Sequence, residues 1–155
     1  NRIRNLIDFS PANIGRATTR GIEVSAQGKI CDHYLGWRGC YTWQQASDDV
    51  TGSRLVRRAR HRASLDLMSE PVKGLLLGAG MTYSGGVEDN DFSVFPSVRK
   101  ELDSVVLLRA YCSYQLNDNV SLHGRVENLL DRTYEEIANY PGRGLGVFGG
   151  MRVRW

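Results

Sequence analysis

Catalysis by a nucleophile, an acid–base pair or a metal ion needs His, Cys, Asp or Glu at recognisable spacings. The three histidines stand far apart in the sequence, as His33, His61 and His123. They form no H-E-x-x-H or H-x-x-H motif, and the chain has no G-x-S-x-G motif. Asp131, Glu135 and Glu136 lie close together, but carboxylates in or beside a loop are usually solvated, so we do not interpret them as an acid–base pair. The sequence predicts no catalytic residues and no enzyme.

Metal ligands are equally sparse. The chain has three cysteines, Cys31, Cys40 and Cys112. Their odd number and the lack of C-x-x-C spacing argue against a disulfide framework and against a zinc site. Glu88, Asp89 and Asp91 are neighbours, but the glycine and the distal glutamate of a calcium-binding EF-hand are missing. We interpret the cysteines as packing residues and the acidic group as a solvated loop, and we expect no metal site and no cofactor.

Two other motifs suggest phosphate or nucleic-acid binding but have simpler explanations. Residues 144–149 match G-x-G-x-x-G, yet only six residues follow, too few for the helix that this motif requires. Residues 57–62 read R-R-A-R-H-R, but they open a predicted strand in which Arg60 and Arg62 project to one side. We expect this patch to line a polar lumen or to face the anionic outer leaflet of a membrane, and no nucleic acid to bind.

The composition indicates one folded domain rich in strands. The chain has 155 residues, of which 41% are hydrophobic, 24% are charged and 17 are glycine, and its net charge of +3 is too small to name a partner. No stretch approaches the roughly 18 to 20 apolar residues of a membrane helix, which excludes a helical membrane protein but not a membrane β-barrel. Because the first residue is Asn and not Met, we expect either a removed signal segment or a start within a longer protein.

Apolar and polar residues alternate with a period of two along almost the whole chain, which indicates strands with one apolar and one polar face. Near the C-terminus, for example, Val147 and Val153 fall on one face while Phe148 and Arg152 fall on the other. The alternation predicts about eight strands. They cover residues 3–9, 22–27, 35–44, 62–67, 74–84, 106–115, 120–127 and 145–155.

The predicted connections alternate in length. Short turns are expected at residues 31–34, 70–73 and 117–119, and long polar loops at 47–57, 85–103 and 135–143. Short turns on one rim and long loops on the other are typical of an antiparallel up-and-down β-barrel of the bacterial outer membrane.

The cost of burying charge predicts which face meets lipid. An arginine that faces lipid at mid-membrane costs about 2–4 kcal/mol, so we expect Arg62, Arg109, Arg125 and Arg152 to point into the lumen. Six aromatic residues fall on the apolar face near strand ends, as an interfacial girdle requires: Trp37, Tyr41, Trp43, Tyr83, Tyr114 and Trp155. Alternation alone also fits a soluble barrel with the faces reversed, such as a lipocalin.

Several segments resemble TonB-dependent outer-membrane receptors. Residues 126–135, VENLLDRTYE, resemble the signature of the penultimate strand of these receptors, and residues 140–143, YPGR, resemble their last loop. Residues 147–155 resemble the closing strand, with Trp155 where the family usually ends in Phe. Earlier segments that are similar to family strands are residues 5–8, 13–23 and 57–67. The NLID, NLLDRTYE and YPGR segments look most like the cobalamin-receptor branch.

The resemblance implies that residues 1–155 are the C-terminal portion of a 22-stranded transmembrane β-barrel, with the plug domain and the TonB box outside this chain. It implies an outer-membrane receptor that imports a metal-chelate nutrient, cobalamin or a ferric siderophore. The energy would come from the TonB complex, acting through the missing N-terminal region. Further partners implied by the resemblance are outer-membrane lipid, lipopolysaccharide and the barrel assembly machinery.

The resemblance also names candidate site residues. Loop aromatics and polar groups bind substrate in such receptors, which points to Phe92, Phe95, Tyr140 and Arg143. Residues of the last strand would close the barrel and signal its assembly, namely Phe148, Val153 and Trp155. The alternative is a stand-alone eight-stranded outer-membrane barrel with a structural or adhesive role, its lumen filled by Arg, Glu and Tyr side chains.

Overall fold

The computed structural model describes residues 16–30 and 34–155, which form antiparallel β-strands. In chain order the strands are β1 (Ala17–Ile30), β2 (Leu35–Asp48), β3 (His61–Val72), β4 (Leu75–Ser84), β5 (Val87–Asp91), β6 (Val98–Leu102), β7 (Val105–Gln115), β8 (Val120–Glu127), β9 (Glu135–Ile137), β10 (Tyr140–Pro141) and β11 (Gly146–Val153). The predicted all-β antiparallel fold class is confirmed.

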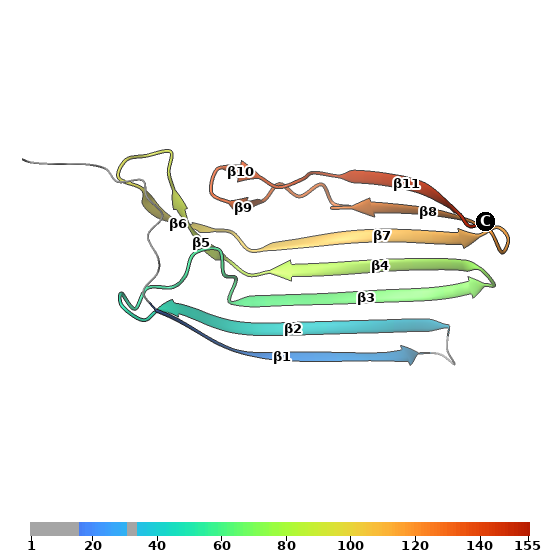
Figure 1. Ribbon diagram of the computed structural model, residues 1–155, viewed down its shortest axis with the longest axis horizontal. Coiled ribbons are helices and arrows are strands. Elements are labelled where there is room, and N and C mark those ends of the chain that lie inside the picture. Colours follow the sequence, from blue (N-terminus) through green and yellow to red (C-terminus); the bar gives the residue numbers. More distant parts are fainter. Residues whose placement is uncertain (1–15, 31–33) are drawn as a thin grey trace, which may run out of the picture.

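Seven strands form one sheet in the order β1-β2-β3-β4-β7-β8-β11, so the chain runs up and down through it. The hairpins β5–β6 and β9–β10 belong to separate two-stranded sheets. In Figure 1 the turns after β3 and β7 lie at the end where the C-terminus is, and the long connections with both hairpins lie at the other end. Short turns and long loops therefore occupy opposite rims, as predicted.

Local chemistry explains the two tight turns. Gly74, between β3 and β4, has a φ of +83°, a left-handed conformation that glycine adopts without steric cost. Between β7 and β8, the Asn117 side-chain oxygen accepts hydrogen bonds from the backbone N–H groups of Asn119 and Val120, at 3.0 and 2.9 Å. Such side-chain bonds are the reason that Asn is common in turns.

The strand register separates apolar from polar residues. One row of paired residues across six strands is apolar throughout: Trp37, Leu67, Ala79, Ala110, Val126 and Val147. The next row, on the opposite face, is charged except at a glycine: Arg38, Asp66, Gly80, Arg109 and Glu127. Because side chains alternate across a strand, this register gives the sheet one apolar and one polar face.

The long strands overlap seven of the predicted ones, while the predicted strand at residues 3–9 lies outside the described residues. Residues 31–33 of the first predicted turn also lie outside them. The loops predicted at 85–103 and 135–143 were wrong in one respect, since each contains a short hairpin. These hairpins lack apolar alternation, and contacts between loops hold them instead.

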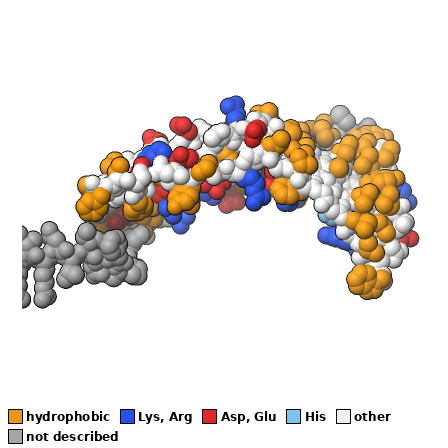
Figure 2. Space-filling view, turned by 90° about the horizontal axis from the view of Figure 1, so that it is seen from above, with side chains coloured by type: hydrophobic (Ala, Val, Ile, Leu, Met, Phe, Trp, Pro, Cys, Tyr) orange, Lys and Arg blue, Asp and Glu red, His pale blue; other side chains and the backbone are white. Residues whose placement is uncertain are grey.

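Very few hydrophobic side chains are buried in the described part of the chain. They are Ala46, Ala59, Leu102 and Ala138, all at the end of the long connections. Ile22 and Val24 on the apolar face are 63% and 58% exposed. In Figure 2 hydrophobic side chains gather at the right-hand end, the end of the C-terminus in Figure 1. β1 and β11 stand at opposite edges of the sheet, so the described strands do not close into a small barrel of the lipocalin type.

No helix among residues 16–30 and 34–155 has the length and apolar character needed to cross a membrane.

Candidate functional site: a loop cluster above a polar wall

The three long connections meet at one end of the sheet and form what we call the loop cluster, residues 49–60, 85–104 and 128–145. Asp89 in β5 lies at its centre and is fully buried. Its Oδ1 accepts hydrogen bonds from Arg57 Nε at 3.0 Å and from the backbone N–H of Asn90 at 2.9 Å. Its Oδ2 accepts one from the backbone N–H of Ala138 at 2.9 Å. A single carboxylate thus joins all three connections.

Further charged pairs link the same connections around Asp89. The Glu88 carboxylate lies 2.9 Å from Arg54 Nη1 and 3.4 Å from Arg99 Nε. Lys100 Nζ lies 3.0 Å from Glu135 Oε2. Exposed ion pairs contribute only about 0–1 kcal/mol each. Together, however, these ion pairs reinforce the contacts between segments that the buried Asp89 already joins.

Three carboxylates of the loop cluster have lowered pKa values. Burial raises the pKa of Asp89, but the hydrogen bonds from Ala138, Arg57 and Asn90 outweigh burial and leave this pKa below its ordinary value. The hydrogen bonds from Ser93 lower the pKa of Asp91, and the hydrogen bond from Lys100 lowers the pKa of Glu135. These hydrogen bonds therefore favour the charged form of Asp89, Asp91 and Glu135.

Asn128 organises the connection that leads from β8 into β11. It is buried and has a φ of +48°, which Asn tolerates better than most residues. Its Nδ2 donates to the carbonyls of Arg132 and Arg143 at 2.9 and 3.0 Å, and its Oδ1 accepts from the backbone N–H of Arg132 at 2.9 Å. Asp131 Oδ1 accepts from the backbone N–H of Leu145 at 2.8 Å. The VENLLDRTYE segment is thus a loop-shaping motif.

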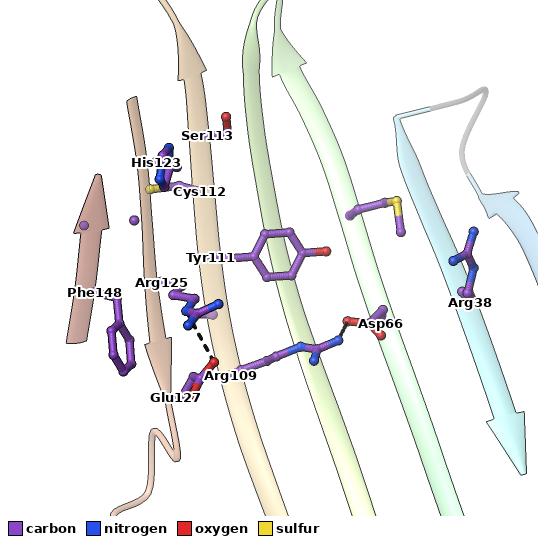
Figure 3. A pocket seen from close by; sticks show the side chains of 14 residues that line it. Arg38, Asp66, Arg109, Tyr111, Cys112, Ser113, His123, Arg125, Glu127 and Phe148 are labelled. Atoms are coloured by element: carbon purple, nitrogen blue, oxygen red, sulfur yellow. Dashed lines mark hydrogen bonds and ion pairs between the residues drawn. The ribbon is translucent and has the colours of Figure 1, made fainter. Parts of the chain in front are cut away.

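The polar face of the sheet is hollowed below the loop cluster. A hollow of about 720 Å³ extends across β2, β3, β7, β8 and β11. Figure 3 shows its charged side chains, including the ion pair of Arg109 with Asp66 and that of Arg125 with Glu127. The predicted separation of arginines from the apolar face therefore holds for Arg109 and Arg125.

A second hollow, of about 640 Å³, lies between the polar face and the loop cluster. Hydroxyl groups of the strands line its wall, at Thr42, Ser64 and Thr82, while Glu135 and Ile137 of β9 line it from the loop side. The volume is within the range of about 300–1,000 Å³ that small-molecule sites occupy. The two hollows give the polar face space for a ligand below the loops.

Three of the predicted substrate residues lie on exposed loops. Phe92, Phe95 and Tyr140 are 72%, 87% and 69% exposed. Asn139 Nδ2 donates to Asp91 Oδ1 at 2.7 Å, which joins the loop before Phe92 to the loop before Tyr140. Arg143 is separate, since its guanidinium carbon lies 5.9 Å from the centre of the Phe148 ring, at the top of the polar face.

The three residues predicted to close the barrel do not share one face. Phe148 lies on the polar face, where the Arg125 guanidinium stacks 4.7 Å from its ring centre. Val153 pairs with Val120 on the adjacent strand, and Trp155 lies beyond the end of β11, fully exposed. Phe148 therefore lines the hollow on the polar face and lies away from the strand end near Trp155.

Two interpretations of acidic residues need correction. Asp89 was expected in a solvated loop, but it is fully buried because three donors from three connections converge on it. Glu135 was also expected to be solvated, but it is half-buried and pairs with Lys100, whereas Asp131 is exposed as expected and also accepts a bond from Leu145. Sequence reasoning missed this network, and its only signal was the clustering of acidic residues in one loop and arginines in another.

The thiols and histidines show no sign of a metal centre in the part of the chain that the structure describes. No group of three or more His, Cys, Asp or Glu side chains comes together there to hold a metal ion. Cys40 and Cys112 are free thiols, and Cys31 lies outside the described residues.

Comparison with known proteins gives relatives of one kind. The vitamin B12 transporter BtuB of Vibrio cholerae is 28% identical over 148 residues, which make up 90% of this chain and 23% of that protein. The ferric enterobactin receptor PfeA shares the fold, with a TM-score of 0.77 and 22% identity over 91% of this chain and 23% of the receptor. The ferric-catecholate import receptor Fiu of E. coli K12 has a TM-score of 0.72 and 22% identity, over 88% of this chain and 21% of Fiu.

The chain thus spans about a quarter of the length of the relatives that it matches. The family model described as TonB dependent receptor-like, beta-barrel matches residues 1–129. This match covers more than half of the chain and agrees with the open antiparallel sheet and its two distinct faces. The chain belongs to the TonB-dependent receptor-like β-barrel family and is a protein of the bacterial outer membrane.

Proposed function

We propose that residues 1–155 form the C-terminal portion of the barrel domain of a receptor that imports a metal-chelate nutrient, cobalamin or a ferric siderophore, energised by TonB. The observation that carries this proposal is the loop cluster, where one buried carboxylate joins three connections directly above a hollowed polar wall. A preorganised surface of this kind is suited to capturing a small ligand, because binding then orders few further groups.

The names of the relatives support the substrate class. One relative by sequence is a vitamin B12 transporter, and the structural neighbours include receptors for ferric enterobactin and ferric catecholates. Cobalamin and these ferric chelates are bulky, with flat conjugated groups and many oxygen atoms. Exposed aromatic side chains bury such groups, and hydroxyl groups bond their oxygens.

We assign substrate contact to Phe92, Phe95 and Tyr140 on the loop cluster. Together they present exposed aromatic surface, and a hydrogen bond between neighbouring residues joins their two loops. Arg143 would meet the substrate later, at the top of the polar face beside Phe148. We therefore expect Tyr140 to contribute mainly to the first binding of the substrate at the loops, and Arg143 to the movement of the substrate along the polar face.

The remaining partners follow from the family. The TonB complex would act through a region outside residues 1–155. The apolar face would contact lipid and the outer rim lipopolysaccharide, and the barrel assembly machinery would recognise β11 and the residues that follow it, including Trp155. A stand-alone barrel is less well supported, because β1 and β11 stand at opposite edges of the sheet in the described part of the chain.

The test is uptake by the complete receptor in cells that lack other receptors for the same nutrients. Cells would be given radiolabelled cyanocobalamin or a ferric catecholate, with and without a functional TonB complex. We expect TonB-dependent uptake of one of them, and about tenfold weaker binding when Tyr140→Ala is combined with Arg143→Ala. Full affinity in a correctly assembled double variant would refute the site, and uptake of neither probe would refute the substrate class.

The apparent mass of the native product tests the alternative. An antibody against residues 84–105 should detect a product several times larger than 17.4 kDa in outer-membrane fractions. A product of 17.4 kDa would instead identify a small stand-alone barrel.

A further inference from the structure

We propose that Asp89 is a positioning residue that holds the β9–β10 hairpin on the β5–β6 hairpin, so that Tyr140 and Phe92 are presented to a ligand from two joined loops. This inference rests on the proposed function and goes beyond it, because it assigns ligand affinity to a residue that no ligand can touch. Asp89 is fully buried, whereas Phe92 and Tyr140 are both largely exposed.

The first step is the connection between β2 and β3, which fixes Asp89 from one side. Arg57 has a φ of +59° and donates twice to the β5 hairpin. Its backbone N–H bonds the carbonyl of Glu88 at 2.8 Å, and its Nε bonds Asp89 Oδ1 at 3.0 Å. The backbone of Arg57 adopts a conformation that is unfavourable for most side chains, and these two bonds compensate for it.

The second step leads from Asp89 to Tyr140. Ala138 is buried, and its backbone N–H bonds Asp89 Oδ2. The next residue, Asn139, has a φ of +67° and bonds Asp91 Oδ1 through Nδ2 and Glu135 Oε2 through its backbone N–H. The chain therefore turns sharply between Ala138 and Tyr140, and bonds to the β5 hairpin hold both residues before Tyr140.

The third step is that the position requires a charged carboxylate. The two oxygens of Asp89 accept three hydrogen bonds, one of them from a guanidinium. An asparagine has the same shape but one acceptor oxygen, and its NH₂ group would face a donor. An unsatisfied buried donor raises the free energy of the folded state. We therefore expect the exposed β9–β10 hairpin, which contains Tyr140, to move away from the substituted side chain in Asp89→Asn.

The experiment compares Asp89→Asn with Asp103→Asn in the complete receptor. Asp103 is an exposed carboxylate just after the β5–β6 hairpin and serves as the matched control. We expect amide hydrogen exchange in residues 135–141 to become about tenfold faster in Asp89→Asn and to stay unchanged in the control. This readout needs no ligand, so it is independent of the substrate. Unchanged exchange in Asp89→Asn would overturn the proposal.

The second readout is affinity for the probe that the receptor takes up, cyanocobalamin or a ferric catecholate. We expect Asp89→Asn to weaken binding about tenfold, and Asp89→Asn with Tyr140→Ala to bind no more weakly than Tyr140→Ala alone. Additive losses would overturn the proposal, because they would mean that Asp89 does not act through Tyr140. Faster exchange without binding of either probe would refute the proposed function and leave the positioning of the loops intact.

If Asp89→Asn does not assemble in the membrane, Arg57→Gln gives a milder test of the same carboxylate. It removes the bond from Arg57 Nε to Asp89 Oδ1 and leaves Asp89 in place. We expect amide exchange in residues 135–140 to become about threefold faster. Unchanged exchange in Arg57→Gln would overturn the proposal.

Discussion

Arg109 on β7 and Asp66 on β3 form an ion pair, with 2.6 Å between Nη2 and Oδ1, although strand β4 lies between their strands. Gly80 of β4 is paired with both residues in the register, and its missing side chain leaves the space that the pair occupies. A Cβ at Gly80 would lie 2.6 Å from both Arg109 Nε and Asp66 Oδ1. The polar face of β4 therefore lacks a side chain at Gly80, where its neighbours reach across it.

Gly78, one step along the same face, allows a direct test of this arrangement. The Tyr111 ring from β7 covers Gly78 so closely that any Cβ would overlap it. We expect Gly78→Ala to lower the free energy of unfolding of the receptor by about 1–3 kcal/mol, because the ring must leave its position. Denaturant unfolding in lipid vesicles measures this change.

The matched control is Gly149→Ala, at a glycine of β11 where an added Cβ has no contact closer than 3.9 Å. It should change the free energy of unfolding by less than about 0.5 kcal/mol. Equal effects of the two substitutions would mean that Tyr111 does not rest on Gly78.

Asn128 makes a second prediction, since both its backbone and its side chain are used. Asn128→Gly permits the positive φ without a Cβ and removes three hydrogen bonds, whereas Asn128→Ala removes the same bonds and keeps a Cβ in the left-handed region, which Ala tolerates less well than Asn. We expect both variants to expose residues 129–145 to protease, with Asn128→Ala less stable than Asn128→Gly by about 1 kcal/mol. Equal protease resistance of wild type and Asn128→Gly would show that the side-chain bonds do not hold this loop.

Acid should loosen the loop cluster. The pKa values of Asp89, Asp91 and Glu135 are lowered in the folded chain, from 3.8 for the aspartates and 4.5 for the glutamate. A lowered pKa contributes stability that is complete above the ordinary value and is lost as the pH falls through the folded value. We therefore expect constant protection of the Ala138 amide from pH 7 to about 5 and a loss below about 4.

Hydrogen exchange, corrected for its intrinsic dependence on pH, measures this protection. Amides in the middle of β7 serve as the internal reference, because sheet pairing on both sides holds them. A loss of protection between pH 7 and 5 would contradict the assignment, since the three carboxylates remain charged in that range.

The sheet could be predicted from the sequence because its strands follow one simple rule. Alternation of residues such as Val147 and Phe148 fixes the two faces, and turn residues such as Asn117 fix where strands end. The register then follows, since a slip by one residue would bring Arg109 onto the apolar face. Every step of that reasoning uses local sequence.

The loop cluster could not be predicted in this way. Asp89 is bonded by Arg57 and Ala138, which are distant in the sequence and have no shared periodicity. From the sequence alone, Asp89 between Glu88 and Asn90 is expected to be solvated, and only the arrangement of the three connections in space shows that it is buried. Family resemblance alone suggested Phe92 and Tyr140 as substrate residues, whereas the bonds from Asp89 and Asn139 to the loops around them required the structure.

Trp155 makes the last prediction, because its proposed role in assembly can be separated from stability. The side chain lies beyond β11 and is fully exposed, so the folded sheet gains no packing from it. We expect its deletion to reduce the amount of receptor inserted in the outer membrane several-fold, while the refolded protein in detergent keeps its free energy of unfolding to within about 0.5 kcal/mol. Trp155→Phe, which keeps an aromatic ring at this position, should keep normal insertion. Normal insertion without Trp155 would remove the closing-strand role, and an equal loss of insertion and stability would show that Trp155 acts by packing.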